Sequence, residues 1–222
     1  MKKVNVAIDG PSGAGKSSVS KEIARRLSYT PINSGSLYRA IAFNAVMKKV
    51  HLEDELAVFA TLEKGMVEIK DDESVWLYGV NVSNEIRDDV ISQGAAKVAK
   101  HQKVRSFVVE HVQAMTKENK GYIVDGRDTT FKLLPHAEVK IFLWADPEER
   151  AKRRCAQNEK LGYKTNYEEV LYETKMRDAQ DMNREFDPLH KTKDAVEVDC
   201  TNMTFDEVVS TIIELIEERA NA

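Results

Sequence analysis

Residues 10–17 constrain the fold of this chain more than any other segment. They read Gly-Pro-Ser-Gly-Ala-Gly-Lys-Ser, which matches the phosphate-binding pattern G-x-x-x-x-G-K-[ST] at every fixed position. Residues 4–8 before it are mostly apolar, as in a strand buried on both faces, and residues 17–27 after it have the spacing of an amphipathic helix. In such a unit, backbone N–H groups and the helix N-terminus point at phosphate oxygens. The pattern therefore predicts a nucleoside triphosphate site rather than an ordinary glycine-rich turn.

Two side chains of this loop have expected roles of their own. Lys16 is expected to reach the β- and γ-phosphates, and the Ser17 hydroxyl is expected to help hold Mg²⁺. The glycines allow a tight curve and a close approach of the anion. The residues expected to bind ATP are Gly10, Pro11, Ser12, Gly13, Ala14, Gly15, Lys16, Ser17 and Ser18.

Composition limits the kind of partner. The chain has 222 residues and a formal net charge of −4, so it can form one α/β domain and gives no reason to expect a nucleic-acid or membrane-surface partner. No apolar run approaches the ~20 residues that span a bilayer. Cys155 and Cys200 are isolated, which fits a reducing compartment. We expect a cytoplasmic protein.

Strand-like and helix-like segments alternate along the chain. Short segments rich in Val, Ile and aromatic residues are expected to be strands at 122–125, 139–144 and 195–198. Helical spacing of apolar residues is found at 37–49, 147–159, 167–183 and 205–219. This alternation predicts a doubly wound α/β fold with a central parallel sheet.

One stretch interrupts the alternation. Residues 67–69 and 75–82 are expected to form an antiparallel ribbon that turns near 71–73, followed by helical segments around 86–100 and 104–116. We interpret this stretch as an insert, about 67–120, in a core made of 1–66 and 121–222.

The first candidate site for a second anion lies at residues 33–39, Asn-Ser-Gly-Ser-Leu-Tyr-Arg. Ser34 or Ser36 can cap the helix that follows, and its N-terminus favours an anion. Tyr38 and Arg39 are expected to point away from the buried helix face. In the alternative interpretation, the serine is only a cap and Arg39 only a solvated charge.

Two further clusters combine arginine with aspartate. Residues 125–128, Asp-Gly-Arg-Asp, follow a predicted strand at the sheet edge where open α/β folds bind ligands, although a surface ion pair would look the same. Arg177, Asp181 and Arg184 have the spacing of one helix face, which also fits a row of salt bridges within the helix.

The three clusters favour one class of phosphate-loop protein. A GTPase is expected to carry Asp-x-x-Gly and Asn-Lys-x-Asp motifs, and neither is present. A kinase must bind a second, anionic substrate near the γ-phosphate, and the arginines supply the positive charge for that binding site. A regulatory protein that binds ATP without transferring phosphate has no need of them.

Taken together, these motifs resemble the bacterial-type cytidylate kinases, a family of nucleoside monophosphate (NMP) kinases. The resemblance runs nearly end to end. It rests on residues 7–17, 34–40, 82–83 with 86–87, 104–105, 125–128, 147–151, 177–178 with 181, 183–184 and 188–189.

The resemblance implies a P-loop three-layer fold, a hairpin-containing NMP-binding region, a helical lid near 152–166, and a monomer. It implies transfer of the γ-phosphoryl group of ATP to CMP or dCMP, with UMP or a non-nucleotide acceptor as the alternative. Arg105 and Asp128 would read the cytosine, and Arg153 or Arg154 would lie near ATP. Lys16, Arg127, Arg177 and Arg184 would be catalytic. The residues implied to bind CMP are Ser34, Tyr38, Arg39, Arg105, Arg127, Asp128, Arg177, Asp181 and Arg184.

Three positions depart from the pattern of that family. Asn33 stands where the pattern has Asp, Thr130 where it has Gly, and Ala96 where it has a Ser that helps to contact the base. None of these changes removes a catalytic charge. The change at Ala96 bears on how strictly cytosine is selected.

Overall fold

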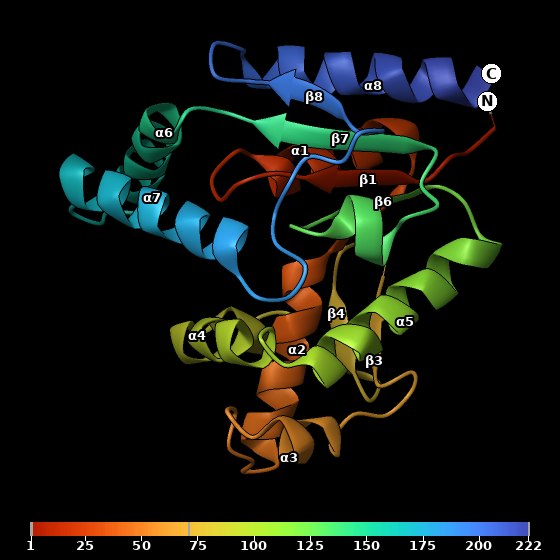
Figure 1. Ribbon diagram of the computed structural model, residues 1–222, viewed down its shortest axis with the longest axis vertical. Coiled ribbons are helices and arrows are strands. Elements are labelled where there is room, and N and C mark those ends of the chain that lie inside the picture. The colour runs from red at the N-terminus through yellow and green to blue at the C-terminus, as the bar shows by residue number, and fades with distance from the viewer. Residues whose placement is uncertain (1, 71, 222) are drawn as a thin grey trace.

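A five-stranded parallel sheet forms the centre of the computed structural model, which describes residues 2–70 and 72–221 (Figure 1). The strand order is β2-β6-β1-β7-β8. The strands are β1 (Val6–Asp9), β2 (Thr30–Asn33), β6 (Tyr122–Asp125), β7 (Val139–Trp144) and β8 (Val196–Asp199). The prediction of a central parallel sheet is confirmed.

Helices cover both faces of this sheet, and the alternating side chains of β1 show how. Val6 and Ile8 pack with α1 (Lys16–Leu27) and α8 (Phe205–Asn221), whereas Ala7 packs with the cluster that includes α2 (Ser34–Met47) and α5 (Gln102–Glu118). All three β1 residues are fully buried, as expected for a strand between two helical layers. The three-layer prediction is confirmed.

The interrupting stretch forms a second, smaller sheet. Its strands are β3 (Val67–Ile69), β4 (Val75–Leu77) and β5 (Val80–Asn81), in that order and antiparallel. The predicted antiparallel pairing of residues 67–69 with the segment 75–82 is confirmed by β3 and β4. That segment is divided into two strands, which was not predicted, because Tyr78 and Gly79 adopt left-handed φ values of 49° and 77° and turn the chain back. Asp71, at the predicted turn, lies outside the described residues.

Short helices precede and follow this second sheet in the chain. They are α3 (Glu55–Phe59), the 3₁₀ turn η1 (Glu85–Arg87) and α4 (Asp89–Val98). Figure 1 shows α3 and α4 in the lower half of the molecule, with α2 and α5. The boundaries of core, insert and lid stay predictions.

Strand β2 and the start of α2 differ from the sequence expectations. β2 was not predicted, because Thr-Pro-Ile-Asn is short and contains a proline, which an edge strand tolerates. α2 begins at residue 34 and is capped by Asn33, whose side chain accepts a hydrogen bond from the N–H of Ser36. The expected cap at Ser34 or Ser36 was wrong, since both residues already lie within the helix.

Two consecutive helices, α6 (Pro147–Lys160) and α7 (Tyr167–Asn183), project beyond the carboxyl ends of the strands (Figure 1). The π-helical turn η2 (Thr129–Leu133) follows β6. Within the described part of the chain, no helix combines the length and apolarity needed to cross a membrane.

Gly10 is fixed by a close approach between strands, and this yields a stability prediction. A Cβ at this position would lie 2.0 Å from the backbone oxygen of Leu143 in β7. Gly10→Ala should therefore lower the free energy of unfolding by about 3 kcal/mol or more, measured by urea denaturation.

Gly65→Ala is the matched control. Gly65 has φ +80° and no heavy atom within 4 Å of the added Cβ, so only backbone strain of about 1 kcal/mol is expected. Equal losses in the two variants would contradict the close-approach argument.

Candidate active site

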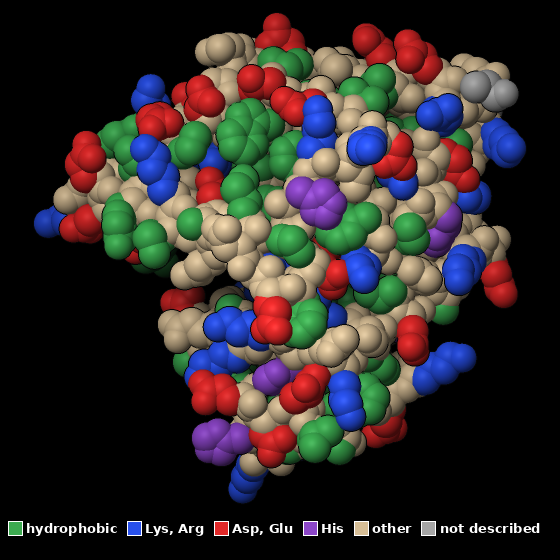
Figure 2. Space-filling model, viewed as in Figure 1, with side chains coloured by type: hydrophobic (Ala, Val, Ile, Leu, Met, Phe, Trp, Pro, Cys, Tyr) green, Lys and Arg blue, Asp and Glu red, His purple; other side chains and the backbone are tan. Residues whose placement is uncertain are grey.

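The carboxyl ends of β1, β2 and β6 meet at one large cleft. In the sheet register Asp125 lies opposite both Asn33 and Ile8, so these strand ends are adjacent. The cleft has a volume of about 1420 Å³, which exceeds the roughly 300–1,000 Å³ of a single small-molecule site. Figure 2 shows the surface hollowed between α7 and α4. The cleft can hold two ligands.

Most of the site residues predicted from the sequence line this cleft. Gly10 and Pro11 are the exceptions, although their carbonyl groups accept hydrogen bonds from Lys16. The predicted residues that line the cleft are Ser12, Gly13, Ala14, Gly15, Lys16, Ser17, Ser18, Ser34, Tyr38, Arg39, Arg105, Arg127, Asp128, Arg177, Asp181 and Arg184.

Lys16 begins α1 and is buried beneath the loop. Its Nζ donates to the backbone oxygens of Gly10 and Pro11, both at 2.7 Å. Burial lowers the pKa of Lys16 and the cationic Arg127 adds to this effect, while Asp125 and Asp9 oppose it. A phosphate at the loop would supply the negative charge that favours the protonated lysine.

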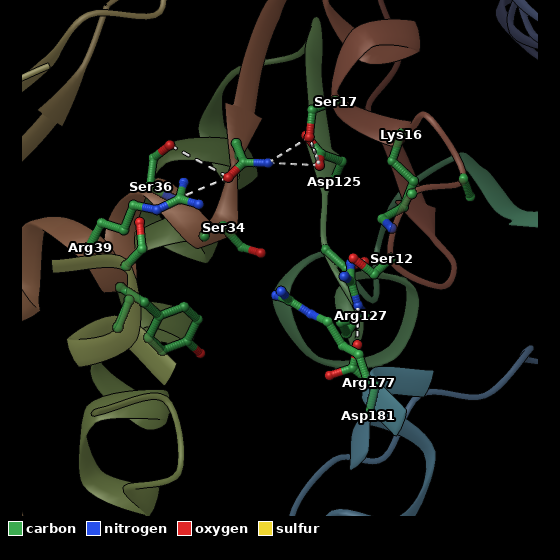
Figure 3. Close-up of a pocket in the computed structure, with 18 of the residues that line it drawn as sticks. Ser12, Lys16, Ser17, Ser34, Ser36, Arg39, Asp125, Arg127, Arg177 and Asp181 are labelled. Atoms are coloured by element: carbon green, nitrogen blue, oxygen red, sulfur yellow. Dashed lines mark hydrogen bonds and ion pairs between the residues drawn. The ribbon is translucent and has the colours of Figure 1, made fainter. Parts of the chain in front are cut away.

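Ser17 and Asp125 form the part of the cleft that suits a hard divalent cation. Ser17 Oγ donates to Asp125 Oδ2 at 2.9 Å, and Asn33 Nδ2 donates to the same two oxygens (Figure 3). Burial raises the pKa of Asp125, whereas Lys16 and the hydrogen bonds from Ser17 and Asn33 lower it. Mg²⁺ is bound by oxygen ligands such as hydroxyl and carboxylate groups, so Ser17 and Asp125 fit the ion implied by the loop. Asp125 was not among the predicted metal ligands.

The N-terminal turns of α2 form one wall of the cleft. Gly126 approaches Ser34 so closely that a Cβ would lie 2.7 Å from Ser34 Oγ. Tyr38 is buried, contrary to the expectation that it points away from the buried helix face. Its Oη has no hydrogen-bond partner among the described residues. A buried hydroxyl without a partner at a cleft wall suits a hydrogen bond to a bound ligand.

Arg127, Asp181 and Arg177 form the opposite wall. In Figure 3 they face Ser36 and Arg39 across the pocket. Arg127 Nε donates to Asp181 Oδ2 at 2.6 Å, so this pair joins the turn after β6 to α7. Within the described residues, neither Arg39 nor Arg177 makes an ion pair under 4.0 Å. Two arginines are thus available for anions.

The predicted row of residues on α7 needs a correction. Helix α7 ends at Asn183, so Arg184 lies at its C-terminal cap and not on the helix face shared by Arg177 and Asp181. Arg184 Nε donates to the carbonyl of Asp187 at 2.6 Å. The row does not form salt bridges within itself, because Asp181 pairs with Arg127 and Arg184 lies beside Asp128.

Arg105 and Asp128, the pair expected to read the base, are buried and bound to each other. Arg105 also donates to Asp187 at 3.1 Å and to the carbonyl of Ala99 at 3.1 Å. Burial raises the pKa of Asp128, and the cations Arg105 and Arg184 oppose this. The pair lines the cleft in a fixed orientation.

Sequence reasoning missed two interactions that hold the site together. The buried carboxylate of Asp9 accepts hydrogen bonds from the N–H of Thr129 and from the N–H and hydroxyl of Thr130, at 2.7–2.8 Å. The threonine that replaces a family glycine therefore anchors the turn that follows Asp128. A signal was present, because Asp9 directly follows the apolar residues of the first predicted strand.

The second missed interaction is a buried ion pair. Arg150 on α6 is 1% exposed and binds Asp178 on α7 through both terminal nitrogens, at 3.0 and 2.5 Å. It also donates to the carbonyls of Ala145 and of Ser12 in the phosphate loop, each at 2.8 Å. One guanidinium thus joins both helices to the loop.

Arg153 and Arg154, expected near ATP, both line the cleft. Arg153 is held by Glu149 and by the carbonyl of Cys200, at 3.1 and 2.7 Å. Arg154 donates to Gln157 at 3.4 Å. Arg153 is therefore the more fixed of the two.

A phosphate loop at the edge of a parallel sheet, facing arginines across a cleft for two ligands, defines a kinase of the P-loop class. The family model for cytidylate kinase matches residues 6–218. The chain belongs to the cytidylate kinase family.

Individual relatives agree with this assignment. The cytidylate kinase of Mycoplasmopsis synoviae is 55% identical over 214 residues, which cover 96% of this chain and 98% of that protein. That of Mycoplasmopsis agalactiae is 51% identical, with 98% of each chain covered. A solved gluconokinase from Sinorhizobium meliloti has a TM-score of 0.51 at 15% identity, covering 99% of this chain and 94% of its own, and supports the fold alone.

The Arg150–Asp178 pair yields a stability prediction. Asp178→Ala would leave the guanidinium of Arg150 buried without its counter-charge, so the free energy of unfolding should fall by about 3–5 kcal/mol in urea denaturation.

The exposed pair Glu148–Lys175 is the matched control, because it also links α6 to α7, at 2.8 Å. Glu148→Ala should leave the stability unchanged within error, since solvent screens this pair. A comparable loss in both variants would show that burial is not the cause.

Proposed function

We propose that this chain transfers the γ-phosphoryl group of ATP to CMP or dCMP, giving ADP and CDP or dCDP. The observation that carries the proposal is the placement of Arg39 and Arg177. Both line the cleft beside the phosphate loop, and neither has an ion-pair partner among the described residues. Partial desolvation within the cleft is the main cause of a lowered pKa at Arg177, and the positive charge of the neighbouring Arg127 adds to it. An acceptor phosphate would balance that charge.

Catalysis in this proposal depends on position and charge. The acceptor phosphate has a second pKa of about 6 and is largely a dianion at neutral pH, so no general base is required. Lys16 would turn from the loop carbonyls to the donor phosphates. Arg127, Arg177 and Arg184 would stabilise the charge that spreads over the transferring group.

Mg²⁺ belongs to the proposal as the partner of ATP. When bound, it supplies positive charge that neutralises phosphoryl oxygens. Ser17 and Asp125 are the residues that would hold it, and their hydrogen bond keeps both oxygens at the foot of the loop.

The base would be read by the buried pair on the acceptor side. Arg105 and Asp128 are bound to each other, and Tyr38 presents a hydroxyl with no partner in the described structure. Burial raises the pKa of this phenol, so it remains a hydrogen-bond donor. Ser34 and Asp181 would contact the phosphate and the ribose. Family membership supports a cytoplasmic monomer, which stays a prediction.

The proposal predicts a specific order of acceptors. ADP release, measured in a coupled assay with ATP and Mg²⁺, should be fast with CMP and dCMP and at least about 10-fold slower, as kcat/KM, with UMP. AMP and shikimate should give only background. A preference for UMP would overturn the assigned roles of Arg105 and Asp128, and turnover without any acceptor would overturn the kinase assignment.

Two cations that line the cleft should strongly affect the rate. Lys16→Met and Arg177→Ala should each lower kcat by about 100-fold or more, because each removes a charge that stabilises the transition state. The melting temperature of Arg177→Ala should stay within error, since no ion pair is lost.

Lys193→Ala serves as the control for charge removal, because Lys193 is exposed and does not line the cleft. It should keep the full rate. Near-normal turnover in either Lys16→Met or Arg177→Ala would contradict the mechanism.

A further inference from the structure

Asn33 connects three elements that carry the two halves of the cleft. It is the last residue of β2 and lies opposite Asp125 of β6 in the sheet register. Its Nδ2 donates to Ser17 Oγ at 2.9 Å and to Asp125 Oδ2 at 2.8 Å. Its Oδ1 accepts from the N–H of Ser36 at 3.0 Å. One side chain therefore binds α1, β6 and α2.

We propose that Asn33 is a positioning residue, which fixes the acceptor helix α2 relative to the donor site at Ser17 and Asp125. This inference rests on the proposed function. α2 carries Tyr38 and Arg39, the acceptor side of the cleft. The distance between the acceptor phosphate and the γ-phosphate thus depends on how α2 sits beside the phosphate loop.

The chemistry of the amide suits this role. An asparagine side chain has two N–H donors and a carbonyl acceptor, and all of these groups are used at Asn33. A serine in its place could still accept from the N–H of residue 36, but it has no amide to donate to Ser17 and Asp125. A substitution can therefore keep the helix cap while removing the hydrogen bonds to Ser17 and Asp125.

Gly35 leaves room for the side chain of Asn33 to make these hydrogen bonds. A Cβ on Gly35 would lie 2.9 Å from Asn33 Oδ1, closer than real Cβ contacts. Gly35 thus lets the carbonyl of the asparagine fold back over the first turn of α2, while its amide nitrogen faces the phosphate loop.

The reaction is sensitive to this kind of alignment. Misplacing reacting groups by about 1 Å can reduce a rate by about 100-fold, even where ground-state binding is kept. Loss of the hydrogen bonds from Asn33 to Ser17 and Asp125 should therefore lower kcat. The affinities for CMP and ATP, which depend on contacts within each half of the cleft, should change little.

The test compares Asn33→Ser, Asn33→Ala and the control Asp54→Ala. Asp54 caps α3 in the same way, accepting from the N–H of Ala57 at 2.9 Å, and does not line the cleft. For each variant we would measure kcat with ATP and CMP, the dissociation constant for CMP by calorimetry, and the melting temperature.

Asn33→Ser should lower kcat by about 10- to 100-fold with less than about a 3-fold change in the dissociation constant for CMP and a near-normal melting temperature, because the cap is kept. Asn33→Ala should lose both rate and stability. Asp54→Ala should lose stability and keep its rate.

The outcomes distinguish the positioning role of Asn33 from the proposed function. A normal kcat for Asn33→Ser, in a chain whose unaltered form phosphorylates CMP, would overturn the positioning role and leave the proposed function intact. A fall in kcat for Asp54→Ala as large as for Asn33→Ser would also overturn it, since loss of rate would then follow any damaged cap. Failure of the unaltered chain to phosphorylate CMP would overturn both.

Discussion

The register of three parallel strands is the constraint on which the whole site depends. β2, β6 and β1 are paired so that Asn33, Asp125 and the start of the phosphate loop come to the same edge of the sheet. Only at the carboxyl ends of parallel strands do the loops from several strands meet in this way. A shift of β2 by one residue would turn Asn33 away from Asp125 and reverse the side chains of that strand.

In this geometry the arginines have two different roles, one structural and one in binding. Arg150 and Arg105 are buried and bind carboxylates, so they hold α6, α7 and α5 against the edge of the sheet. Arg39 and Arg177 have no ion-pair partner in the described structure and line the cleft. A buried charge without a partner is costly, so the buried and paired arginines belong to the scaffold. Arg39 is half-buried and Arg177 is exposed, so both can remain unpaired in the cleft and bind phosphate there.

The sequence was sufficient for the parts of the structure that depend on local pattern. The glycine-rich loop predicted strand, loop and helix, and apolar periodicity predicted most of the larger helices and four of the five strands in the main sheet. The same pattern failed at β2, because four residues with a proline give no periodic signal. It also failed at Tyr78 and Gly79, where left-handed backbone turned a predicted ribbon into three strands.

Long-range pairing explains the remaining differences. Nothing near Arg150 in the sequence indicates that it binds Asp178, since 28 residues separate them. Likewise, the alternative interpretation of Arg177, Asp181 and Arg184 was a row of salt bridges within the helix, whereas the fold brings Arg127 to Asp181. Residue types and positions could be predicted, but partners that depend on how α6 and α7 pack could not.

Tracing the phosphoryl group tests the central claim most directly. ATP labelled in its γ-phosphoryl group would be incubated with the protein, CMP and Mg²⁺, and the products would be separated. The two-substrate cleft predicts that the label appears in the β-phosphate of CDP, in an amount equal to the ADP formed. Label found only in inorganic phosphate, or unchanged in ATP, would contradict this account.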